Sequence, residues 1–169
     1  MLNKQYTSML QEKDVIFEIF QYATERAKVV GAENIYDFSL GNPSVPAPSI
    51  VNETIVQKVN TLDPLALHGY SPSFGIMETR EKIAAFYKAS NIFMAIGAAG
   101  ALAHAFRAVT NPGDEIITFA PCFSEYKPYT AGAGLKLTII PADIDTFQIN
   151  FAAFEAQLNE NTTAVLINS

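Results

Sequence analysis

The chain has 169 residues, of which 49% are hydrophobic and 17% are charged, a composition typical of a globular protein with a core. Its net charge of −6 and its lack of a lysine and arginine cluster exclude the basic surface that nucleic-acid binding needs. No stretch is apolar over a membrane-spanning length, and the N-terminus lacks the pattern of a secretory leader. The single Cys122 has no partner for a disulfide or a metal site. We therefore expect a cytoplasmic protein.

The first part of the chain predicts an amphipathic helix followed by an extended, proline-rich segment. Apolar residues recur at helical spacing from Val15 to Val30, and Gly31 supplies a stop. Residues 34–40 indicate a short extended segment, and the prolines between residues 43 and 48 exclude a helix there. Gly41 stands just before these prolines, where the lack of a side chain would let a ligand approach the backbone closely.

Two more helices and a long loop are expected next. Ser49 can cap a helix that runs to about Asn60 with its apolar residues on a buried side. Another helix is expected from Ile76 to Ala89, with Phe86 facing inward. Residues 63–75 lie between them and are rich in proline, glycine and aromatic residues, including Tyr70. An irregular stretch of this length usually serves a site or an interface.

The centre of the chain predicts a strand, a glycine turn and a helix. Residues 92–96 have the length and β-branching of a buried strand, Gly97 supplies the turn, and an alanine-rich helix starts at Ala98. The first N–H groups of a helix lack helical partners, so the helix dipole would favour a phosphate there by about 0.3 to 1 kcal/mol, and up to ~2 kcal/mol when partly buried. A glycine turn of this kind also serves simply to pack a helix closely against a sheet, and it matches neither the nucleotide nor the dinucleotide motif.

The remainder alternates strand and helix. Strands are expected at Glu115–Ala120, Leu135–Ile140 and Thr163–Asn168, and helices at Tyr126–Gly132 and Phe151–Leu158. This order predicts an α/β fold with a partial, doubly wound and mainly parallel sheet that carries helices on both faces. Ligands bind such sheets beyond the carboxyl ends of the strands, where the Gly97 turn and Phe123 are expected.

Several short motifs, taken in order, resemble the class I/II pyridoxal-phosphate-dependent aminotransferases, the aspartate aminotransferase-like group of fold type I. The matching segments lie within residues 15–169 and are Ser39-Leu40-Gly41-Asn42-Pro43, Gly69-Tyr70, Gly75-Ile76 with Arg80, and residues 97–102, 111–115, 121–123 and 165–169. The resemblance implies the N-terminal portion of such an enzyme. Residues 1–45 would form a helix and extended segment of the small domain or arm, and residues 46–169 an incomplete large domain that binds pyridoxal 5′-phosphate.

The resemblance also implies a role for each matching residue. Gly97, Ala98 and Ala99 match the turn whose backbone N–H groups hold the cofactor phosphate. Phe123 matches the aromatic ring that stacks on the pyridine, although an ordinary core aromatic is the alternative. Tyr70 matches the tyrosine that reaches the phosphate of the neighbouring subunit, which implies a homodimer. Gly41 matches the glycine whose backbone lies against the substrate carboxylate.

The chain departs from the family pattern in three places. None of its lysines has the sequence context of the lysine that holds the cofactor as a Schiff base, so we expect no catalytic residue in this chain and no activity from it alone. The family usually has a longer connection near residues 88–91, so either residues are missing from this sequence or the local packing differs. Relatives also often carry a hydroxyl residue near Ala95–Ile96, and losing one charge-assisted hydrogen bond there would weaken cofactor binding by about 1.5 to 3 kcal/mol.

The function implied by the resemblance is transfer of an amino group between an L-amino acid and a 2-oxo acid. A C–S or other lyase on the same fold remains an alternative, as does a non-catalytic fragment or a partner-dependent binding module. His68 and His104 lack a paired carboxylate, so we assign them no acid–base role. Asp143 and Asp145 are expected in a solvated loop, and we expect neither a metal site nor a membrane partner.

Overall fold

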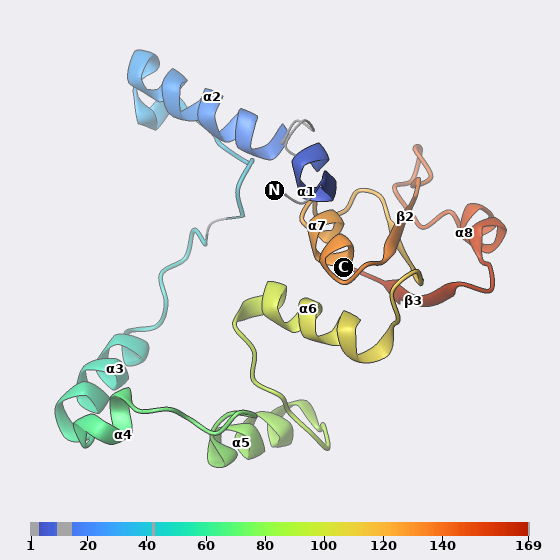
Figure 1. The fold of residues 1–169 in the computed structure, drawn as a ribbon. Helices are drawn as coiled ribbons and strands as arrows, with labels where there is room; N and C mark the ends of the chain where they lie inside the picture. The colour runs from blue at the N-terminus through green and yellow to red at the C-terminus, as the bar shows by residue number, and fades with distance from the viewer. Residues whose placement is uncertain (1–3, 10–14, 42, 169) are drawn as a thin grey trace. The chain divides into compact units, whose positions relative to one another are not determined.

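A computed structural model of the chain describes residues 4–9, 15–41 and 43–168 (Figure 1). The chain divides into two compact units. Residues 1–13 and 95–169 form the first, which we call the sheet unit, and residues 14–94 form the second, which we call the helical unit. The predicted division into residues 1–45 and 46–169 concerns the whole protein and stays a prediction.

The sheet unit is built on three parallel strands in the order β2-β1-β3, counted within the described residues. They are β1 (Glu115–Phe119), β2 (Lys136–Ile140) and β3 (Thr162–Leu166). β1 pairs in register with β2 along its whole length, and its pairing with β3 contains one irregularity after Glu115. Helices α7 (Tyr126–Gly132) and α8 (Phe151–Gln157) lie in the two connections, as parallel strands require crossovers of this kind. The predicted parallel α/β arrangement is confirmed.

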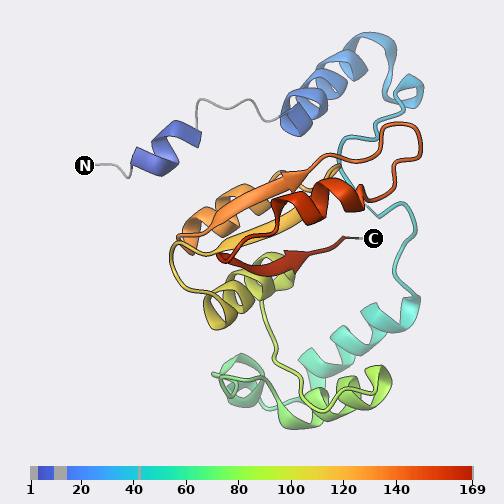
Figure 2. The ribbon, with the colours of Figure 1, turned by 90° about the vertical axis from the view of Figure 1, so that its right-hand side faces the viewer.

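Helices cover both faces of this sheet. Successive residues of a strand point to opposite faces. On one face Ile116 of β1 is fully buried in a cluster with Phe106 of α6 (Gly97–Val109) and Leu135. On the other face the ring of Phe119 lies 5.5 Å from that of Phe154 in α8. Figures 1 and 2 show α6 and α7 on one side of the strands and α8 on the other.

The start of α6 lies at the carboxyl edge of the sheet. α6 ends at Val109, and a tight turn closed by a hydrogen bond of 3.0 Å from Asp114 N to Asn111 O leads directly into β1. A helix joined to a strand by so short a turn runs back along it, so the first turn of α6 lies near the end of β1. The chain enters α6 at the edge toward which all three strand arrows point (Figure 2). In the sheet unit the Gly97 turn therefore lies at the carboxyl edge of the strands, where ligands are expected to bind.

Local signals in the sequence placed several helix ends correctly, but Ser49 does not cap its helix, since Pro48 occupies the capping position and Ser49 is the first helical residue. The Asn150 side chain accepts a hydrogen bond of 2.9 Å from Ala153 N at the start of α8. Gly31 adopts φ 90° and follows α2 (Val15–Val30) as the predicted stop. Two helices were missed by the sequence analysis: α1 (Lys4–Met9) in the sheet unit, and α4 (Pro64–His68), whose cap is the Asp63 carboxylate.

The described residues of the helical unit form helices and irregular segments. Besides α2 and α4, the elements are η1 (Ala32–Asn34), α3 (Ser49–Thr61) and α5 (Met77–Tyr87). The expectation that apolar sides of α3 and α5 are buried was wrong, since no residue of either helix is buried and Phe86 is 80% exposed. Periodicity decides which side of a helix is apolar, but a covering surface must come from elsewhere in the fold.

The expected buried strand at residues 92–96 was also wrong. This segment has no strand pairing, and the Ile96 side chain is almost fully exposed. Its backbone is held instead by Met94 N donating to Phe74 O at 3.3 Å and by the Arg80 guanidinium donating to Ile92 O at 2.6 Å. A β-branched run becomes a strand only where a neighbouring strand pairs with it. Of the helices in the described part of the chain, none is both long and apolar enough to cross a membrane.

Candidate functional site

The first turn of α6 presents backbone donors without a cap. Ile96 occupies the capping position and provides no side-chain hydrogen bond. Gly100 N donates to Ile96 O at 3.3 Å, whereas no turn or cap bond among the described residues uses the N–H groups of Ala98 or Ala99. Gly97 adopts φ +65°, and a Cβ added to it would meet no atom within 4 Å, so the turn faces open space. Two free amides therefore point out from the helix start.

These donors suit an anion with several oxygens, such as a phosphate. The helix of 13 residues directs the positive end of its dipole at this turn. Residues 91–109 contain no aspartate or glutamate that would repel an anion. The methyl side chains of Ala98 and Ala99 leave the amides accessible. The residues predicted to hold a cofactor phosphate thus have the chemistry that a phosphate requires.

Phe123 lies in the loop that leaves the carboxyl end of β1. The loop passes through a cis peptide bond between Ala120 and Pro121. Phe123 is 47% exposed, so it differs from a fully buried core aromatic. It meets the ring of Tyr126 edge to face, with ring centroids 5.8 Å apart and ring planes at 83°. The sheet unit places this ring and the Gly97 turn at the same edge of the sheet.

Cys122, beside Phe123, has the properties of a packing residue. Partial burial raises the pKa of its thiol, and the positive charge of Lys127 offsets this only in part. A raised pKa keeps the thiol protonated at neutral pH, where a reactive cysteine would be a thiolate. The structure gives no support to a redox role for this side chain.

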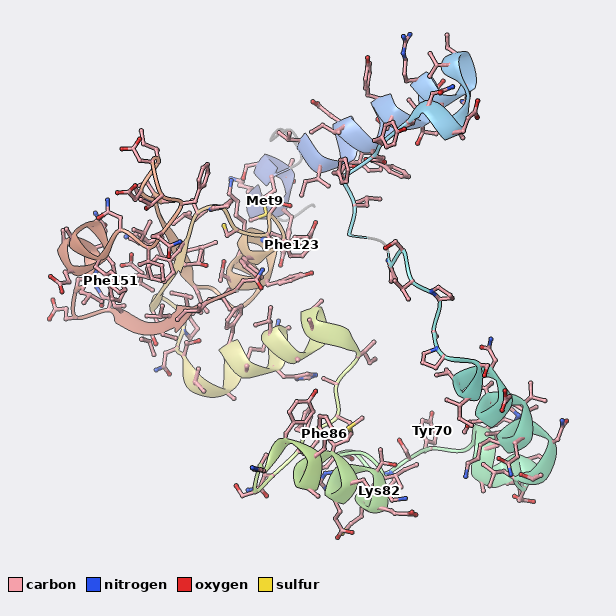
Figure 3. All side chains as sticks on the ribbon, turned by 180° about the vertical axis from the view of Figure 1, so that it is seen from behind. Met9, Tyr70, Lys82, Phe86, Phe123 and Phe151 are labelled. Carbon is pink, nitrogen blue, oxygen red and sulfur yellow. The ribbon has the colours of Figure 1, made fainter. Side chains whose placement is uncertain are left out.

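Tyr70 and Gly41 belong to the helical unit. Tyr70 lies on the connection between α4 and α5, and its ring is fully exposed (Figure 3). A Cβ added to Gly41 would meet no atom within 4 Å, so the backbone there is open to a ligand. The roles predicted for these two residues stay predictions.

The acidic and histidine residues that we set aside remain outside the site. The Asp143 carboxylate accepts hydrogen bonds from the amides of Asp145 and Thr146 at 3.1 and 3.0 Å, which lowers its pKa and makes it the organiser of a turn. The prediction of a loop here is confirmed. His68 and His104 both lie exposed on helices. Within the described ranges no three His, Cys, Asp or Glu side chains gather as a metal ion would require.

Sequence reasoning missed one buried carboxylate, that of Glu115 at the amino end of β1. Its side chain is 3% exposed and accepts hydrogen bonds from Asn159 Nδ2 at 2.8 Å, from Lys136 Nζ at 3.2 Å and from the Thr138 hydroxyl. Chiefly the Thr138 and Asn159 bonds hold the pKa of Glu115 below its usual value, against the effect of burial. These donors come from β2 and from the segment before β3, so Glu115 ties the strands together at the edge opposite to Gly97. The signal in the sequence that could have revealed this buried carboxylate was a glutamate at the first position of a strand rich in β-branched residues.

The sequence model of one protein family and two relatives of this chain all point to the aminotransferases. The sequence model of the family described as aminotransferase class I and II matches residues 32–169. The chain is 31% identical over 156 residues to an aspartate aminotransferase of Thermotoga maritima, covering 87% of this chain and 40% of that protein. It is 24% identical over 148 residues to human tyrosine aminotransferase, covering 81% of this chain and 32% of that protein.

A solved structure extends this similarity to the fold. The crystal structure of an amino transferase from Eubacterium rectale superposes with a TM-score of 0.89 at 44% identity. The superposition covers 100% of this chain and 45% of that one. The chain therefore spans less than half the length of the relatives that it matches.

Proposed function

Since the chain belongs to the aminotransferase class I and II family, we infer that the whole protein transfers an amino group between an amino acid and a 2-oxo acid with pyridoxal 5′-phosphate. The relatives named above are all aminotransferases, which favours transfer over the elimination that a lyase performs. The bound cofactor would supply the electron-withdrawing ring that makes the Cα–H bond of an amino acid acidic. The residues of this chain would bind and orient that group.

The observation that carries this proposal is the uncapped start of α6. Ala98 and Ala99 offer their N–H groups to the phosphate, and Gly97 leaves the approach open. Phe123, at the same edge, offers an aromatic face to the heterocycle. Together these two features match the two ends of pyridoxal 5′-phosphate, one anionic and one flat and aromatic.

We propose that the lysine that bonds covalently to the cofactor lies elsewhere in the whole protein. An amine must lose its proton to act as a nucleophile, which a nearby carboxylate opposes. Lys82 lies 2.7 Å from Glu78, and this pair raises the pKa of Lys82. Lys28 and Lys136 are likewise paired with Glu25 and Glu115. The carboxylate beside Lys82 therefore favours the protonated form of its amine.

Two further residues are proposed to act in the assembled enzyme. The fully exposed ring of Tyr70 is available to reach the phosphate of a neighbouring copy, so we propose a homodimer in which the site is shared. The open backbone at Gly41 is proposed to lie against the carboxylate of the amino acid or 2-oxo acid.

The proposed phosphate cradle is tested by replacing Ala99 with aspartate. A carboxylate in the first turn of α6 competes for the free amides and repels an anion, while acidic residues at this position favour the helix itself. We expect Ala99→Asp to weaken binding of inorganic phosphate by about tenfold or more, because two charges about 4 Å apart near a surface interact by about 4 kcal/mol. Isothermal titration calorimetry at physiological ionic strength measures the affinity.

Ala105→Asp is the matched control, since Ala105 is an exposed alanine of the same helix and the variant carries the same net charge. It lies about 9 Å further along the helix axis, roughly one Debye length at physiological salt. We expect its phosphate affinity to stay within about twofold of the unmodified chain. Equal losses in the two variants would show a general charge effect and would contradict the proposed cradle.

A further inference from the structure

Phe123 is a half-exposed aromatic residue on a loop. It lies in neither a helix nor a strand. Tyr126 is the aromatic partner that the structure gives to its ring. An aromatic ring on a loop can stack on a ligand only if something fixes the direction that its face takes.

Tyr126 is itself firmly placed. Its side chain is 7% exposed, and its backbone N–H donates to Phe123 O at 3.2 Å. Its carbonyl accepts a hydrogen bond of 2.9 Å from the hydroxyl of Thr130, which is fully buried in α7. Tyr129 and Ala133 then pack α7 against the core cluster. The position of Tyr126 is therefore determined by the core of the sheet unit.

The edge-to-face contact between the two rings keeps a face of Phe123 open. With ring planes at 83°, one ring directs its edge at the face of the other. If the edge belongs to Tyr126, the Tyr126 ring covers one face of Phe123 and leaves the other uncovered. If the edge belongs to Phe123, the Tyr126 ring covers neither face. Either arrangement agrees with the exposure of the Phe123 ring.

We propose that Tyr126 is a positioning residue whose buried ring, in edge-to-face contact with Phe123, sets the direction in which Phe123 presents an open face to the heterocycle of pyridoxal 5′-phosphate. This inference rests on the proposed function for the identity of the ligand. Tyr126 acts through Phe123 and need not touch the ligand itself.

The first measurement needs no ligand. Vicinal couplings and inter-ring nuclear Overhauser effects of Phe123, measured by NMR on the full 169-residue chain, report its side-chain rotamer. We expect a single rotamer with contacts to the Tyr126 ring in the unmodified chain and in Tyr126→Phe, and averaged rotamers in Tyr126→Leu. Averaging in the unmodified chain, or a single rotamer that survives in Tyr126→Leu, would overturn the proposal. Tyr126→Met makes the same test if the leucine variant does not fold.

The second measurement compares two ligands by calorimetry. Pyridoxine 5′-phosphate has the ring and phosphate but no aldehyde, so it cannot bond covalently to a lysine, and inorganic phosphate has no ring. We expect Tyr126→Leu to raise the Kd for pyridoxine 5′-phosphate by about 2- to 12-fold, the range that an aromatic contact contributes, with phosphate affinity unchanged. The conservative Tyr126→Phe should restore the unmodified affinity. Equal weakening of both ligands would indicate a merely structural role and overturn the proposal.

A double-mutant cycle separates an indirect from a direct effect of Tyr126. In the Phe123→Leu background we expect Tyr126→Leu to cause no further loss of affinity for pyridoxine 5′-phosphate, because no stacking ring is left to position. An additional loss there would overturn the inference. If the unmodified chain binds pyridoxine 5′-phosphate no better than phosphate, the proposed stacking function fails, and the rotamer of Phe123 alone decides the role of Tyr126.

Discussion

Replacing Ile116 with alanine is expected to destabilise the sheet unit by about 2–5 kcal/mol, the largest effect that we predict for any substitution in this chain. Ile116 is 0% exposed and packs with Phe106 and Leu135 between β1 and the helices α6 and α7. Truncation removes buried methyl and methylene groups and leaves a cavity that the surrounding strands cannot close. Because this cluster joins α6 to the sheet, the loss also loosens the support of the Gly97 turn.

Hydrogen exchange of the β1 amides measures this effect within the sheet unit alone. A loss of 2 kcal/mol lowers the protection of these amides by about 30-fold when exchange follows opening equilibria. The matched control is Ile139→Ala on β2, because Ile139 is the same residue type but is 37% exposed. We expect a much smaller loss of protection in that variant. Equal losses at the two positions would show that burial of Ile116 does not determine the stability of the sheet.

Replacing Glu115 with glutamine is expected to cost about 1.5–3 kcal/mol at neutral pH, the value of hydrogen bonds to a buried charged group. The carboxylate accepts bonds from Thr138, Asn159 and Lys136, and its side chain is 3% exposed. Glutamine keeps the shape but removes the charge, and it adds an amide donor where these neighbours already donate. The strands should then separate more easily at the amino edge of the sheet.

The same carboxylate makes stability depend on pH in a defined direction. The pKa of Glu115 is lowered in the folded chain from its ordinary value of 4.5. The folded state therefore binds the proton less readily than the unfolded state, and the stabilisation is fully present above pH 4.5. It is lost as the pH falls through the lowered pKa. We expect the stability difference between the unmodified chain and Glu115→Gln to be constant near neutrality and to shrink below pH 4.5.

Urea unfolding at a series of pH values, followed by hydrogen exchange in β1, checks this expectation. Glu78→Gln is the control, since Glu78 lies closer to its lysine, at 2.7 Å, but is exposed on α5. Solvent screening makes exposed pairs of this kind weak. We expect little change in that variant at any pH. A difference between Glu115→Gln and the unmodified chain that persists undiminished in acid would show that the charge of Glu115 is not what stabilises the sheet.

Local sequence signals were enough for the elements that depend on neighbouring residues. Asn150 and Gly31 mark helix ends because a capping oxygen or a positive φ acts within one turn of the chain. The strand at Glu115–Phe119 follows a turn at residues 111–114, and this pattern is equally local. The alternation of strands and helices then predicted a parallel sheet. In such a sheet Gly97 and Phe123 were expected at the same edge.

Three features were decided by contacts that the sequence does not display. Residues 92–96 resemble a strand, but pairing depends on a neighbouring strand that only the fold supplies. The apolar sides of α3 and α5 were expected to be buried and are exposed, because amphipathicity says nothing about what covers a helix. The importance of Glu115 arises from partners brought close by folding, such as Asn159, which is 44 residues from Glu115.

The sequence by itself determined the alternation of elements, the glycine turn before α6 and the edge of the sheet at which a ligand would bind, since each follows from short-range geometry and from the handedness of crossovers. Only the tertiary structure decided which carboxylate is buried and whether residues 92–96 pair as a strand. Desolvation and strand pairing depend on surroundings that distant residues provide, and these surroundings exist only once the chain has folded.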